Sequence, residues 1–184
     1  MMFFLILAPF MAFAAVSYVA SLTLAVAAGA FVGLAALAVD YLLGRSTKLL
    51  GVATTMIFTG LAAYFAFSGN EWSATHVRLA LNVGMLAIVV ASIIAGRPFS
   101  LQYALERTDA ATIAKPDFLK VNYVLSWVWA GTLALMTAGD MLAIYLPWLS
   151  LWIGLGLTLV VRNTAVRFTK WYPKYIGGEP KPAR

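Results

Sequence analysis

Long runs of apolar residues, separated by short charged gaps, constrain the fold of this chain more than any other feature. Of its 184 residues, 62% are hydrophobic and 11% are charged, whereas a soluble domain carries about 25% charged residues. About 20 apolar residues in a helix cross the hydrocarbon core of a bilayer, and a helix satisfies its own backbone hydrogen bonds where water is absent. The runs are continuous, unlike the alternating segments of a transmembrane β-barrel. The sequence therefore predicts an all-α, polytopic transmembrane helical bundle.

The apolar runs predict six spans. They are expected near residues 3–19, 22–43, 49–68, 79–96 and 121–138, with a sixth that ends near 161. The first 39 residues carry no charged side chain, and one helix of that length would be about 58 Å long, nearly twice the hydrocarbon thickness. We therefore expect a turn at Ser17, Tyr18, Ser21 and Thr23. Five spans are the alternative.

The first predicted span has two notable features. It contains Pro9, which is expected to kink or break the helix because proline lacks a backbone N–H. Its start also lacks the charged residues that precede the apolar core of a signal peptide, and the apolar run is longer than such a core. We expect a retained membrane segment.

Twelve of the thirteen Lys and Arg residues lie in alternate gaps, after the second, fourth and sixth spans, and Arg78 is the exception. Because cations gather in cytoplasmic loops, we expect these two links and the C-terminus to be cytoplasmic. The predicted transmembrane domain covers 1–162, and 163–184 form a basic cytoplasmic tail whose Gly- and Pro-rich end is expected to be disordered. Six spans place the N-terminus in the cytoplasm and five place it outside, and the cation count does not choose between them.

The chain lacks the residue patterns of common catalytic and metal sites. It has no Cys and a single His, His76, so thiol chemistry and a multi-histidine metal site are excluded. No nucleophile–base pair, phosphate-binding glycine loop or helically spaced carboxylate pair is present. We expect a non-enzymatic protein without cofactor or metal. The net charge of +6 is attributed to the positive-inside rule rather than to nucleic-acid binding.

The link between spans four and five contains a candidate interaction segment. Pro98 is expected to end the fourth helix, and Leu101 and Leu105 then lie four residues apart among polar residues, as in a short amphipathic interfacial helix. The candidate interaction or structural residues are Arg97, Pro98, Gln102, Tyr103, Glu106, Arg107, Lys120 and Asn122. The segment is either an interfacial connector with snorkelling cations or a docking surface for a partner protein or an anionic head group.

Three polar residues interrupt the apolar runs. Asn82 and Asn122 are expected to form hydrogen bonds between helices. Asp140 follows Gly139 and is expected at the outer interface, in a turn or as a helix cap. The alternative for Asp140 is a proton or cation site within the membrane.

Gly29 and Gly33 form a GxxxG motif in the second span, with Ala25 on the same face. Small residues at this spacing let a second helix approach closely. The motif indicates either packing within the bundle or the seam of a homodimer.

The order of several short motifs resembles the bacterial intracellular septation protein A family of small polytopic inner-membrane proteins. The motifs are Pro9, Arg45 with Lys48, Phe58-Thr59-Gly60-Leu61 followed by Tyr64, Phe65 and Phe67, then Asn70 and Trp72, Arg97-Pro98, and Phe118-Leu119-Lys120-Val121-Asn122 before the Trp-containing fifth span. Phe118 and Val121 stand where the family has Trp and Leu. Trp129 and Asp140 match the later Trp and Asn of the family only with about one extra helical turn.

The resemblance implies a role in cell-envelope maintenance and septation through contacts with other membrane proteins. It carries over Arg97, Pro98, Lys120 and Asn122 as structural or interaction residues. A second hypothesis is a small transporter or lipid-handling protein, in which Asn82, Asn122 and Asp140 converge on one polar cavity. An enzyme that acts on lipid is the third.

Overall fold

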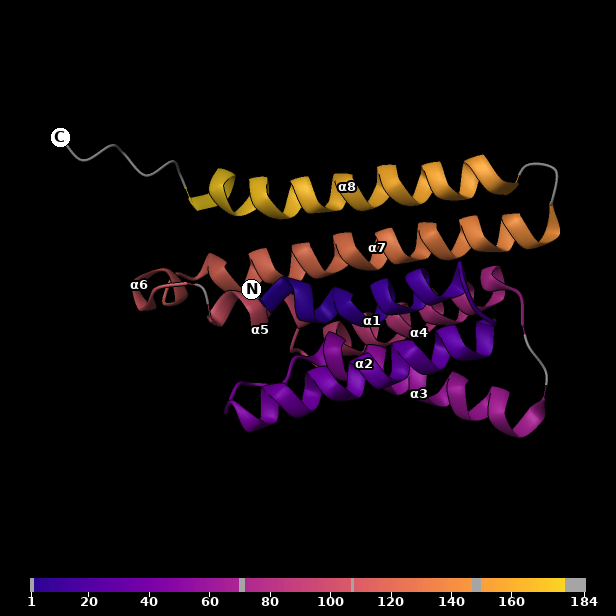
Figure 1. Ribbon diagram of the computed structural model, residues 1–184. Coiled ribbons are helices and arrows are strands. Elements are labelled where there is room, and N and C mark those ends of the chain that lie inside the picture. The colour runs from indigo at the N-terminus through magenta and orange to yellow at the C-terminus, as the bar shows by residue number, and fades with distance from the viewer. Residues whose placement is uncertain (1, 70–71, 107, 147–149, 178–184) are drawn as a thin grey trace. The chain divides into compact units, whose positions relative to one another are not determined.

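The computed structural model describes residues 2–69, 72–106, 108–146 and 150–177 (Figure 1). In these ranges every regular element is a helix, which confirms the all-α fold class. The helices are α1 (Met2–Ser17), α2 (Leu22–Leu42), α3 (Leu49–Ser68), α4 (Ala74–Ile94), α5 (Phe99–Leu105), α6 (Ala110–Ile113), α7 (Asp117–Tyr145) and α8 (Ser150–Gly177). Among the described residues, four helices are long and apolar enough to cross a membrane, namely α2, α3, α4 and α7. The chain forms two compact units, and the first ends at Ile88 within α4.

The first unit is built around Phe58 of α3. This side chain is fully buried, and its ring lies 5.7 Å, centroid to centroid, from the rings of both Phe10 and Phe13 of α1. Val77 and Leu81, at the start of α4, belong to the same cluster of buried side chains. Because lipid tails are as apolar as these side chains, close packing rather than the hydrophobic effect holds such helices together.

The two glycines of the GxxxG motif face α3. A Cβ atom added to Gly29 would lie 2.7 Å from Cδ1 of Phe58, and one added to Gly33 would lie 2.6 Å from Oγ1 of Thr55. Only glycine permits this approach between α2 and α3. The motif therefore serves packing within the chain, because Phe58 and Thr55 occupy the space beside these glycines. A dimer through another surface stays a prediction.

The turn expected within the first 39 residues is present. Helix α1 ends at Ser17, and α2 begins after Ser21, whose hydroxyl accepts a hydrogen bond of 3.3 Å from the N–H of Leu24. Pro9 lies inside α1 without ending it. The other end of the unit has a glycine cap, because Gly69 adopts a φ of 65° after α3, where L-residues with a side chain are strained.

The second unit contains α5, α6, α7 and α8. Helix α8 lies along α7, and α5 packs on the first half of α7 (Figure 1). The indole N–H of Trp129 on α7 donates a hydrogen bond of 3.1 Å to the hydroxyl of Thr169 on α8. Ala165, one turn before Thr169, is buried on the same face of α8.

Three expected helix boundaries differ from the observed ones by five residues or more. Helix α4 begins at Ala74, so Arg78 lies inside it. Helix α7 continues to Tyr145, and Asp140 is a buried residue of this helix. The expectation that Asp140 lies in a turn or caps a helix is therefore wrong. Helix α8 continues to Gly177, well past the expected end near residue 161. The end of the tail, 178–184, lies outside the described residues.

Candidate functional site

The link that follows α4 leaves that helix through a glycine turn. Gly96 adopts a φ of 74°, which glycine reaches without a steric penalty. Pro98 is fully buried directly before α5. The hydroxyl of Ser92, in the last turns of α4, accepts a hydrogen bond of 3.2 Å from the N–H of Phe99. This bond satisfies a donor at the start of α5 that has no partner within the helix.

Three side chains then join α5 to α7, and we call Ser100, Asn122 and Ser126 the polar clamp. The hydroxyl of Ser100 lies 2.8 Å from the backbone carbonyl oxygen of Asn122 and 3.1 Å from its Oδ1. The hydroxyl of Ser126 donates to the Ser100 hydroxyl at 3.0 Å and accepts from the Ser100 N–H at 3.4 Å. The Asn122 side-chain amide donates to the carbonyl of Phe118 at 2.9 Å.

Burial makes the polar clamp a determinant of packing. Asn122 is 2% exposed, and Ser126 has no exposed surface. A buried polar group costs free energy unless it is hydrogen-bonded, and each member of the clamp has its bonds. Asn122 is therefore engaged between helices, as expected, but its main partner, Ser100, was not anticipated. The sequence did not predict these roles for Ser92, Ser100 and Ser126, which are small polar residues near apolar runs.

The exposed and buried sides of α5 differ in character. Tyr103 is half-buried, and its ring meets that of Phe99 edge-on, with centroids 6.3 Å apart. Burial, and secondarily the Glu106 carboxylate, raises the pKa of the Tyr103 hydroxyl above its usual value. Gln102 is half-buried, whereas Glu106 is exposed. Arg107 lies outside the described residues.

Charged side chains surround the clamped helix. Arg97 is exposed two residues before α5 begins. Lys120 is also exposed and forms a 3.4 Å ion pair with Asp117. Asp109 caps α6, a helix that was not predicted. Hydrogen bonds from the backbone N–H of Thr112 and, to a smaller extent, from its hydroxyl hold the pKa of the Asp109 carboxyl below its usual value. The link thus has a surface of mixed charge, and the polar clamp holds its helix α5 against α7.

A cavity of about 240 Å³ lies beside the polar clamp, between α6, α7 and the end of α8. Thr112, Lys115 and Asp117 line one part of it, and Asn122 and Pro173 line another. Its lining combines one cation, one carboxylate and apolar surface, without the converging like charges of an ion site.

Of the intramembrane polar candidates, Asn122 and Asp140 lie on one helix but far apart. Asn82 is half-buried in the first unit, whereas Asn122 and Asp140 belong to the second. On α7 the latter two are 18 positions apart, which corresponds to about 27 Å along a helix. The structure thus separates Asn122 from Asp140.

Within the described ranges, no group of three or more His, Asp or Glu residues is placed to hold a metal ion. Comparison of the chain with protein-family models, with curated proteins and with solved structures found no match.

Proposed function

We propose that the chain is a non-enzymatic protein of the bacterial inner membrane that supports cell-envelope maintenance or septation through contacts with other membrane proteins. The observation that carries this proposal is the polar clamp, which holds α5 against α7 while Glu106 and Arg97 remain exposed. The resemblance to the septation protein A family supports it. Of the positions carried over, Pro98 and Asn122 are buried and hold the link, whereas Arg97 and Lys120 are exposed for contact.

The topology that fits this role has six spans, formed by α1, α2, α3, α4, α7 and α8. The alternating cations then place the links after α2 and α4 on the cytoplasmic side. Helix α5 lies at the interface, and 163–184 form the basic cytoplasmic end. The separate helices α1 and α2 support six spans over five, because both pack on α3.

Single cysteines test this topology, since the chain has none of its own. Tyr18→Cys, in the exposed turn between α1 and α2, should react with an impermeant maleimide in intact cells. Thr47→Cys and Ala111→Cys should react only after permeabilisation. A Tyr18→Cys variant that resists labelling under both conditions would favour five spans.

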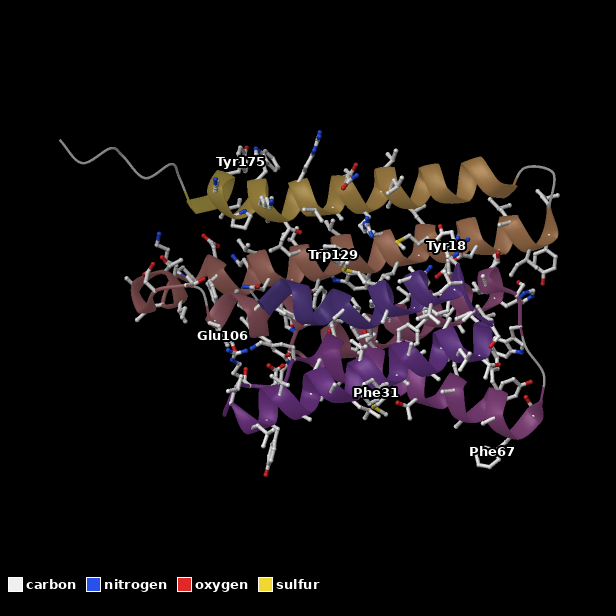
Figure 2. The ribbon with its side chains drawn as sticks, viewed as in Figure 1. Tyr18, Phe31, Phe67, Glu106, Trp129 and Tyr175 are labelled. Atoms are coloured by element: carbon white, nitrogen blue, oxygen red, sulfur yellow. The ribbon has the colours of Figure 1, made fainter. Side chains whose placement is uncertain are left out.

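A photocrosslinking residue tests the partner contacts. At Glu106, labelled in Figure 2, it should capture envelope or division proteins in living cells, because this side chain is exposed at the end of α5. At Phe67, which is 92% exposed at the end of α3, it should not capture the same proteins. Absence of specific neighbours at Glu106, together with a normal envelope after deletion of the protein, would contradict the proposal.

A transporter or lipid-handling role is the second candidate, favoured by the burial of Asp140 inside α7 at 3% exposure. A buried carboxylate in a spanning helix is costly and usually has a functional reason. Asp140→Asn keeps the shape and removes the charge. Under this alternative it abolishes proton- or cation-dependent uptake into proteoliposomes, and under the first proposal it leaves crosslinking at Glu106 unchanged.

A further inference from the structure

The second half of α8 carries two adjoining stripes on its exposed side. Arg167, Lys170 and Lys174 recur at intervals of three and four residues, and all three are exposed. At about 100° per residue they lie roughly 140–200° around the helix from Ala165, which is 2% exposed. The cations therefore point away from the face that packs on α7.

The second stripe is aromatic, and each of its residues directly follows one of the three cations in the sequence. Its members are Phe168, Trp171 and Tyr175. The rings of Trp171 and Tyr175 are stacked with centroids 5.0 Å apart, and Phe168 lies 5.9 Å from Trp171. Trp171 and Tyr175 are 54% and 68% exposed. Figure 2 shows Tyr175 on the outer side of α8.

Packing within the chain does not account for either stripe. Across the described part of the chain, Arg167, Lys170 and Lys174 form no ion pair. Lys174 lies in the last turn of α8, where it is favoured by the helix dipole, but Arg167 and Lys170 are too far from the helix end for this effect. Two stacked, exposed aromatic rings also leave apolar surface uncovered.

The length of α8 places this surface where a bilayer changes from hydrocarbon to head groups. Its 28 residues extend about 42 Å, whereas the hydrocarbon core is about 30 Å thick. Residues 150–161 carry no charge, and the first cation is Arg162. A core of about 30 Å takes up about 20 helical residues. If α8 enters the core at its uncharged end, it leaves the core near Lys170, and Arg167 is close enough to snorkel. The stripes then reach the interface, where Trp and Tyr are enriched and cations meet lipid phosphates.

We propose that the aromatic–basic face of α8, formed by Arg167, Phe168, Lys170, Trp171, Lys174 and Tyr175, binds the head groups of anionic phospholipids. The cations contact phosphate oxygens, and the aromatic rings sit at the depth of the glycerol backbone. This site rests on the placement of the chain in a membrane and not on the proposed partner contacts. Loss of lipid binding and loss of crosslinking at Glu106 are therefore separate results.

The test measures binding of phosphatidylglycerol and of phosphatidylcholine to the full-length protein in neutral detergent, by native mass spectrometry. Wild-type protein should prefer phosphatidylglycerol. Arg167→Gln/Lys170→Gln/Lys174→Gln should weaken phosphatidylglycerol binding about ten- to hundred-fold, since each cation near an anionic lipid surface contributes about five-fold. Phosphatidylcholine binding should not change.

The matched control is Arg97→Gln/Lys115→Gln/Lys120→Gln, which removes the same charge from the link between α4 and α7. This control should retain most phosphatidylglycerol binding. Equal losses in both variants, or no lipid preference in the wild type, would overturn the proposal. If the α8 variant does not fold, the salt dependence of wild-type binding decides: weakening at high salt supports the site, and indifference to salt refutes it.

Discussion

Ser100 on α5 and Asn122 on α7 are joined by a hydrogen bond of 2.8 Å between the serine hydroxyl and the asparagine backbone carbonyl, across 22 positions of sequence. A second contact of 3.1 Å to Oδ1 of Asn122 and the two bonds to Ser126 close the group. The connector between α4 and α7 is therefore a folded element with its own anchor.

Ser100→Ala should loosen this anchor. Loss of the hydroxyl leaves the Asn122 oxygens without their donor and the Ser126 hydroxyl without its acceptor, and we expect about 1 kcal/mol of destabilisation. Hydrogen exchange of the α5 amides should rise, while exchange in α2 should not. Thr164→Ala is the matched control, because that exposed hydroxyl bonds only to the carbonyl of Val160 in its own helix. Equal exchange in both variants would contradict the role of the clamp.

Gly29→Ala should destabilise the first unit by about 1–3 kcal/mol, because the new Cβ would overlap the Phe58 ring and force α2 and α3 apart. Gly60→Ala, on α3, has no atom within 4 Å of the added Cβ. It should be neutral or stabilising by up to about 1 kcal/mol through helix propensity. Unfolding titrations in mixed micelles measure both, and a cost at Gly60 equal to that at Gly29 would refute the packing argument.

Trp129→Phe should weaken the contact between α7 and α8. The replacement keeps an aromatic ring but removes the N–H that bonds to Thr169, at a cost of about 1 kcal/mol. Trp127→Phe is the control, because Trp127 is 56% exposed two residues away. Thermal unfolding followed by near-ultraviolet circular dichroism should separate the two variants. Identical transitions would show that the bond contributes nothing.

Tyr103 predicts an alkaline decline in stability. Because its pKa is raised in the folded state, its contribution is complete below the usual tyrosine pKa of about 10 and is lost as the unfolded state ionises above that pH. Between about pH 9 and pH 11, wild-type protein should therefore lose more stability than Tyr103→Phe. Denaturant titrations across this range measure the difference, and parallel curves would exclude the effect.

Helix positions were largely predictable because apolar runs and helix-ending signals are local. Ser21 was recognised within the turn before α2, and residues 49–68 were predicted to the residue. Asp140 was misplaced because Gly139 suggested a break. A glycine inside a helix costs only about 1 kcal/mol, and the apolar residues after Asp140 continue α7 to Tyr145.

The clamp itself was only half predictable. Asn122 stood out as an amide beside an apolar run, but Ser100 and Ser126 did not. Hydroxyls in apolar helices often bond to a carbonyl of their own helix, as Thr54 does to Leu50 and Thr132 to Val128. Which hydroxyl reaches a neighbouring helix depends on tertiary packing, and the sequence does not show it.

The anchored connector also has a mechanical consequence. A force applied at Glu106 is transmitted to α7 through the hydrogen bonds of the polar clamp. A flexible connector would instead extend under the same force. The Trp129–Thr169 bond then passes the load from α7 to α8. A protein that binds the connector from the aqueous side would therefore transmit force to both α7 and α8, and the two helices would move together.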